Sequence, residues 1–128
     1  MLLPDDQVRS LASIAFEAAP GAVVYADRSP RAPGEVEVGG QRVATQNPSV
    51  LIFRDAAPGA NWMHPCSYAL VDLVTRSVLA RTDSDRPPAF GRLPESWAVA
   101  SDPGGLADLV RPAHDDSRQS SSQKGRES

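Results

Sequence analysis

At 128 residues the chain has room for one domain with one hydrophobic core. The net charge of -3, without a cluster of lysine and arginine, argues against nucleic-acid binding. A single cysteine, Cys66, excludes a disulfide-stabilised scaffold, and no apolar run is long enough to cross a bilayer, so no membrane contact is expected. The N-terminus lacks a signal-peptide pattern, which predicts a cytoplasmic protein and leaves a secreted mature fragment as the alternative.

The segment Asp5–Ala19 is predicted to form a helix. Pro4 followed by two aspartates is typical of a helix start, because carboxylate oxygens accept hydrogen bonds from the free N–H groups and favour the positive end of the helix dipole. The pair Pro20-Gly21 marks the helix end. Apolar residues at helical spacing share one face: Val8, Leu11, Ala12, Ala15, Ala18 and Ala19.

Residues 22–26 are predicted to form a short strand, and the clearest hairpin spans residues 35–44. The Gly39-Gly40 pair forms its turn, because glycine supplies the positive φ that a type I′ turn requires. In that register Val36 lies opposite Val43 on one face of the hairpin. Glu37 lies opposite Arg42 on the other face, where the two side chains have opposite charges.

Residues 50–54 are apolar on both faces, which predicts a strand in the centre of the sheet. Residues 66–73 and 77–82 are predicted to form a second hairpin around the turn at 74–76. Side chains alternate between the two faces of its first strand: Tyr68, Leu70 and Asp72 against Ala69, Val71 and Leu73.

The C-terminal third is rich in proline and glycine, which precludes long regular elements. Trp97–Ala100 is expected to be an edge strand or a packed loop. Asp102 is expected to cap one helical turn over residues 105–110.

These elements predict an α+β fold, with the N-terminal helix packed on one antiparallel sheet of about four to five strands. Successive hairpins are expected to build that sheet. The domain is expected to occupy residues 1–110. Residues 111–128 are polar and are expected to form a disordered tail, because they bury too little apolar surface to offset the entropy of ordering.

The segment Tyr68–Leu79 resembles the terminal hairpin of PepSY-like propeptide domains. The matching positions are Tyr68, Val71, Asp72, Thr75, Val78 and Leu79. Arg76 departs from the family pattern, which has glycine there, a residue suited to a left-handed turn. The resemblance covers about twelve of the 128 residues. It implies a cystatin-like two-layer fold and a role as an inhibitor, chaperone or binding module.

The loop Asn61–Cys66 gathers a tryptophan, a methionine, a histidine and the single cysteine. In an extended chain His64 and Cys66 project to the same face, and an imidazole beside a thiol favours a nucleophilic thiolate. A small cysteine-dependent enzyme using Cys66 with His64 is therefore one hypothesis. The alternative is structural, because cysteine is usually a small buried hydrophobe. Two ligands do not make a zinc site, so neither a metal nor a cofactor is expected.

Asp55 and Asp72 each end a predicted strand, where their carboxylates could approach each other at a sheet edge. Aspartates at strand ends are usually turn formers, and the two Gly-Gly pairs lack the surroundings of a nucleotide-binding loop. The sequence therefore offers little support for acid–base catalysis or phosphate binding.

Trp62 and Trp97 lie in irregular segments with proline and glycine, where binding residues are often displayed, although each could instead cover one end of the sheet. The preferred hypothesis is a non-enzymatic protein- or peptide-binding accessory module of the inhibitor, chaperone-like or immunity type. Its contact surface is predicted to contain Trp62, Met63, His64 and Trp97. An exposed sheet edge would also allow a peptide to add as a strand. A small-molecule carrier is a third hypothesis. The sequence determines neither the oligomeric state nor the partner's identity.

Overall fold

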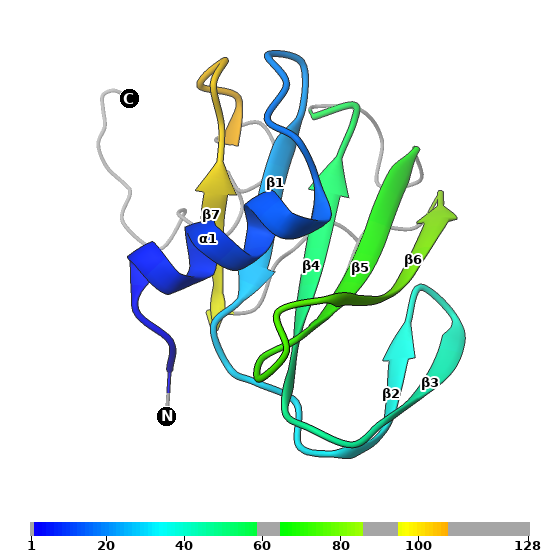
Figure 1. The fold of residues 1–128 in the computed structure, drawn as a ribbon. Coiled ribbons are helices and arrows are strands. Elements are labelled where there is room, and N and C mark those ends of the chain that lie inside the picture. Colours follow the sequence, from blue (N-terminus) through cyan, green and yellow to red (C-terminus); the bar gives the residue numbers. More distant parts are fainter. Residues whose placement is uncertain (1, 59–64, 86–94, 108–128) are drawn as a thin grey trace.

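One α-helix and seven β-strands make up the part of the chain that the computed structural model describes, residues 2–58, 65–85 and 95–107 (Figure 1). The helix is α1 (Asp5–Ala15). In chain order the strands are β1 (Val23–Asp27), β2 (Gly34–Val38), β3 (Gln41–Thr45), β4 (Ser49–Asp55), β5 (Cys66–Asp72), β6 (Val78–Ser84) and β7 (Trp97–Ser101). The predicted tail, residues 111–128, lies outside the described residues.

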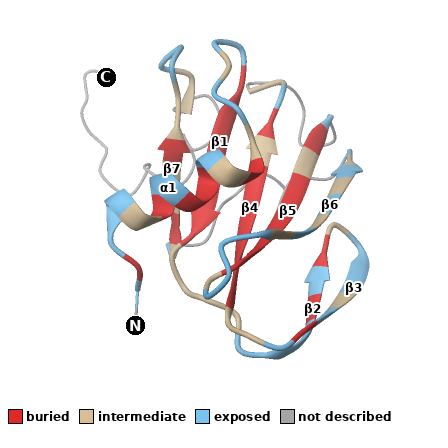
Figure 2. Ribbon diagram, viewed as in Figure 1, coloured by how far each residue is buried: buried red, intermediate tan, exposed pale blue. Residues whose placement is uncertain are grey.

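Five strands form one antiparallel sheet in the order β6-β5-β4-β1-β7, and α1 lies across one face of it (Figure 1). The predicted α+β class is confirmed. The expectation that every hairpin joins one sheet is wrong for β2 and β3, which form a separate two-stranded sheet. The hairpin leaves the main sheet because both faces of that sheet must be covered. Its central strands β4 and β5 are buried along nearly their whole length (Figure 2).

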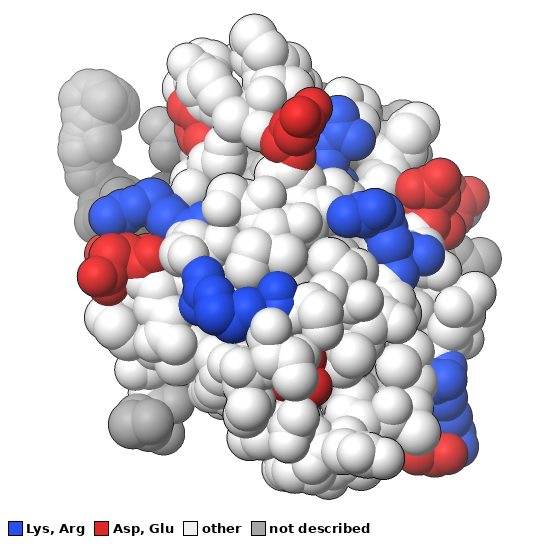
Figure 3. All heavy atoms as spheres, viewed as in Figure 1, with Lys and Arg blue, Asp and Glu red and all other residues white. Residues whose placement is uncertain are grey.

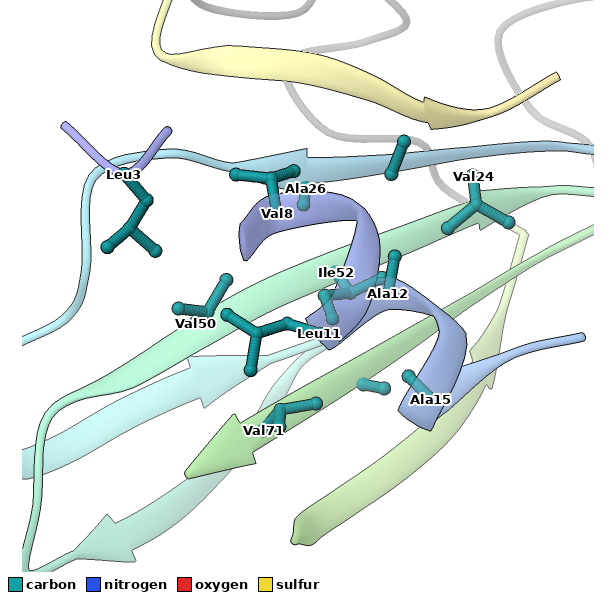
Figure 4. Close-up of a cluster of buried hydrophobic side chains, with 12 residues drawn as sticks. Leu3, Val8, Leu11, Ala12, Ala15, Val24, Ala26, Val50, Ile52 and Val71 are labelled. Atoms are coloured by element: carbon teal, nitrogen blue, oxygen red, sulfur yellow. The ribbon is translucent and has the colours of Figure 1, made fainter. Parts of the chain in front are cut away.

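The helix covers the first face with the predicted apolar stripe. Its buried residues are Val8, Leu11, Ala12 and Ala15. They pack against side chains of β1, β4 and β5 (Figure 4). The helix ends at Ala15 rather than at the predicted Ala19, because Phe16 is already extended. Arg81 of β6 secures this end: its guanidinium donates a hydrogen bond to the Ala15 carbonyl and lies 5.5 Å from the centre of the Phe16 ring.

The β2–β3 hairpin has the predicted register. Its cross-strand pairs include Val36 with Val43 and Glu37 with Arg42. The φ angles at Gly39 and Gly40 are 56° and 92°, which match those of a type I′ turn. The local pattern therefore determines the hairpin itself, independently of where it packs.

This hairpin docks on the sheet face opposite α1. Val36 and Val38 are buried there in a second hydrophobic cluster that includes Leu51, Phe53 and Tyr68. The turn also approaches the sheet closely: a Cβ added at Gly39 would lie 2.5 Å from Cγ2 of Thr82 on β6. A residue with a side chain does not fit at position 39 without displacing its neighbour.

The hairpin of β5 and β6 is the predicted one, and Asp72 organises its turn. One carboxylate oxygen of Asp72 accepts hydrogen bonds from the backbone N–H groups of Val74 (2.8 Å) and Thr75 (2.9 Å). The other oxygen accepts one from the side-chain amide of Asn47 (3.0 Å). Arg76 has a φ of 61°, so this turn contains a non-glycine residue in the left-handed conformation.

The C-terminal described segment contains an edge strand and a capped turn. Trp97–Ser101 forms β7 and pairs with β1, which settles the choice between an edge strand and a loop. Asp102 accepts hydrogen bonds from the N–H groups of Leu106 and Ala107, at 2.7 and 2.9 Å, as expected of a cap. Residues 108–110 lie outside the described part of the chain.

The docking of the hairpin turn predicts an energetic coupling between Gly39 and Thr82. Gly39→Ala is expected to destabilise the protein by about 1–2 kcal/mol through its left-handed backbone, and by about 1–3 kcal/mol more through overlap with Thr82. Thr82→Ser removes only the methyl group in contact. It should therefore recover about 1 kcal/mol of that cost in a double-mutant cycle measured by urea unfolding.

Gly40→Ala is the matched control for this cycle. Gly40 lies in the same turn as Gly39 and also has a positive φ, but a Cβ added at Gly40 has no heavy atom within 4 Å. Its cost should be independent of Thr82→Ser. A Gly39→Ala cost that is likewise additive with Thr82→Ser would contradict the docked position of the turn.

The Asp72 turn predicts a pH dependence of stability. Hydrogen bonds from the Thr75 backbone and then from the Asn47 side chain lower the pKa of Asp72 below its usual value. Because this pKa is lower in the folded than in the unfolded chain, its stabilising contribution is present above about pH 4 and is lost as pH falls through the folded pKa. The melting temperature of Asp72→Asn should therefore fall less steeply below pH 5 than that of the wild type. Parallel melting curves for the two proteins would refute this role of Asp72, and Asn47→Ala should give an intermediate slope.

Candidate functional site

An open groove of about 1100 Å³ lies beside β2, on the face of the sheet opposite α1. Residues 31–33 and β2 form one wall, and the Gly39-Gly40 turn lies at one end. Leu51 of β4 and Tyr68 of β5 belong to the sheet beneath. Ser84 and Asp85, at the end of β6, line it as well. In the part of the chain that the structure describes, the hairpin covers only part of this face, and the groove lies beside it.

The edge of β2 that faces away from β3 has no strand partner among the described residues. In a hairpin with a type I′ turn, Val38 and Gln41 form the first hydrogen-bonded pair, and such pairs recur at every second residue. The N–H and C=O groups of Glu35 and Glu37 therefore point away from β3. Neither makes a backbone hydrogen bond to a described residue outside the hairpin.

The charged side chains along this wall differ in whether they form ion pairs. Arg31 donates a hydrogen bond to the buried carboxylate of Asp27 at 2.5 Å, so its cation is already neutralised. Arg42 lies 3.6 Å from Glu35, and both side chains are largely exposed, so this ion pair is weak. Glu37 makes no ion pair with a described residue, although it lies opposite Arg42 in the register. The exposed negative charge on β2 therefore centres on Glu37.

The floor of the groove continues into an aromatic row in the core. The Tyr25 and Phe53 rings lie 5.9 Å apart, and those of Phe53 and Tyr68 lie 5.4 Å apart. Burial, with a smaller contribution from Cys66, raises the pKa of the Tyr68 phenol above its usual value. The floor is therefore uncharged at neutral pH and apolar apart from the phenol oxygen.

Two of the candidate residues from the sequence lie in the described part of the chain. Cys66 begins β5, where it is buried, and its thiol donates a hydrogen bond to the Ser84 carbonyl at 3.4 Å. Trp97 begins β7 and is 5% exposed, packed in the cluster beneath the hairpin. Trp62, Met63 and His64 lie outside the described residues, so the structure does not address the proposed pairing of His64 with Cys66.

Asp55 and Asp72 do not approach each other. Because β4 and β5 are antiparallel, Asp55 pairs with Cys66 at one end of the ladder, and Asp72 pairs with Ser49 at the other. Among the described residues, no three His, Cys, Asp or Glu side chains are arranged to hold a metal ion. In the same part of the chain, no helix has the length and apolar character needed to cross a membrane.

The surface on the helix side carries scattered charges. Figure 3 shows basic side chains standing apart from one another on this face, with acidic ones among them. No basic patch is visible in that view. The groove, with its acidic strand, lies on the other side of the sheet.

Comparisons with protein-family models, with curated proteins and with solved structures found no match to this chain. Its function is therefore inferred from the geometry and charges of the groove. Sequence reasoning did not single out Glu35, Glu37 or Tyr68 as site residues. The available signal was the alternation in residues 35–38, which indicated an exposed acidic face but not which edge of the hairpin stays open.

Proposed function

We propose that the domain is a non-enzymatic accessory module that binds an extended segment of a protein partner in the groove beside β2. The partner segment pairs with the outer edge of β2 and forms a third strand of the two-stranded sheet. The observation that carries this proposal is the β2 edge beside the groove, which pairs with no strand in the described part of the chain. Outward N–H and C=O groups at Glu35 and Glu37 supply backbone hydrogen bonds, and Leu51 and Tyr68 supply an apolar floor.

The length of β2 determines how many partner residues can pair with it. A strand of five residues such as β2 spans roughly 17 Å at about 3.4 Å per residue. It therefore pairs with about five partner residues. The outer edges of β6 and β7 are also strand edges, but β2 is favoured because its groove gives the partner's side chains a surface to pack on.

The resemblance to PepSY-like domains agrees with this proposal. It implies a cystatin-like arrangement and a role as an inhibitor, chaperone or binding module. A left-handed Arg76 at the family's glycine position supports the resemblance in the turn of the second hairpin. Binding through a strand edge requires neither a cofactor nor a reactive side chain.

The test starts from a display library of random peptides selected on the intact protein. Affinities of the selected peptides are then measured by fluorescence anisotropy for the wild type and for Glu37→Pro. Proline removes the N–H that points to the partner without removing a bond to β3, so binding should weaken at least about tenfold.

Two variants control this experiment. Arg42→Pro places the same residue directly opposite, where the N–H points away from the groove, and it should leave the affinity unchanged. Glu37→Gln keeps the backbone N–H and should change the affinity only a few-fold. Equal affinities for Glu37→Pro and Arg42→Pro, with both proteins folded by circular dichroism, would contradict the proposal, as would a selection that yields no binding peptide.

A further inference from the structure

Resting on the proposed function, we propose that the groove selects a basic extended segment, with lysine or arginine at every second position and small apolar residues between. This selection depends on which way the side chains of β2 point and on which of their charges are already engaged.

The side chains of β2 alternate between the sheet and the solvent. Val36 and Val38 point toward the sheet and are buried, whereas Glu35 and Glu37 are exposed. A strand added to the β2 edge has the same alternation. Its residues opposite Glu35 and Glu37 project to the solvent side beside the two carboxylates, and the residue between them projects toward the groove floor.

The charge of the groove favours cations at those solvent-side positions. Among the described residues, those with charged side chains that line it are Arg31, Glu35, Glu37 and Asp85. The Arg31 guanidinium is held by Asp27. Among the described residues, Glu35 has only the long, exposed contact with Arg42, and Glu37 makes no ion pair. An incoming lysine opposite Glu37 is therefore attracted by its carboxylate, and a glutamate there is repelled.

The groove floor determines which side chain is favoured at the partner position between the two residues that lie opposite Glu35 and Glu37. Leu51 and Tyr68 are each 7% exposed, and Val36 lies beside them. A charged side chain directed at this largely apolar surface would lose hydration, whereas a valine gains apolar contact. The favoured pattern is therefore basic, apolar, basic.

Three capped peptides test this pattern. The first is Thr-Lys-Val-Lys-Val-Lys-Thr, and in the other two glutamine or glutamate replaces every lysine. At low ionic strength the wild type should bind the lysine peptide about fivefold more tightly than the glutamine peptide, and the glutamate peptide most weakly. The preference should shrink at about 0.5 M salt, because these charges are exposed to solvent.

Charge reversal provides the sharpest comparison. Glu37→Lys should reverse the order, so that the glutamate peptide binds more tightly than the lysine peptide. Glu17→Lys changes the net charge equally at an exposed position that does not line the groove, and it should keep the wild-type order. Identical effects of the two variants would overturn the inference, because they would indicate a general charge effect.

The outcomes separate this inference from the function on which it rests. If all three peptides bind the wild type equally and Glu37→Pro still weakens them, the groove binds extended segments without charge selection, and only the inference fails. If none of the three binds and the selected peptides are indifferent to Glu37→Pro, both proposals fail. A lysine preference that Glu37→Lys reverses and Glu17→Lys does not supports both.

Discussion

The structure depends on one constraint: the central strands of the sheet are apolar on both faces, so both faces must be covered. Residues of β4 and β5 are buried on the helix side and on the hairpin side alike, with Ile52 in one cluster and Phe53 in the other. Burying a large apolar side chain of this kind is worth about 1.5–3 kcal/mol. The helix covers the first face, and the β2–β3 hairpin leaves the main sheet to cover the second. The separate hairpin is thus a consequence of the strand composition.

The helix α1 and the β2–β3 hairpin cover their faces of the sheet to different extents, and the candidate site results from this difference. A hairpin of two five-residue strands shields only part of a five-stranded sheet, so the outer edge of β2 borders a groove that the described residues leave open. Gly39 fixes how closely the turn approaches β6, and the type I′ turn fixes which backbone groups face outward. The side chain of Glu37 and its outward backbone groups therefore lie at the groove because of the register of the hairpin. Gly39 therefore determines how the hairpin packs, and Glu37 supplies the groups that the proposed partner contacts.

Local patterns in the sequence predicted the elements better than their arrangement. The Gly39-Gly40 pair and the facing valines were sufficient for the hairpin register, and the stripe from Val8 to Ala15 was sufficient for the helix face. The strand order was not predictable, because β1 pairs with β4 and β7, which are distant in the sequence. Arg81 of β6 contacts the helix end, and this contact has no local signal in the sequence. The groove was missed for the same reason: Glu37 and Tyr68 come together only once the hairpin docks, and the alternation of β2 is identical whether it joins the main sheet or covers it.

Amide hydrogen exchange measured by NMR tests whether β2 is paired on one edge and open on the other. We expect an alternation within this strand: the amides of Val36 and Val38, which face β3, exchange slowly, whereas those of Glu35 and Glu37 exchange at least about tenfold faster. Exchange in the opposite phase would mean that the register is shifted by one residue. Equal and strong protection of all four amides would mean that another part of the protein already pairs with this edge, and would contradict the proposed site.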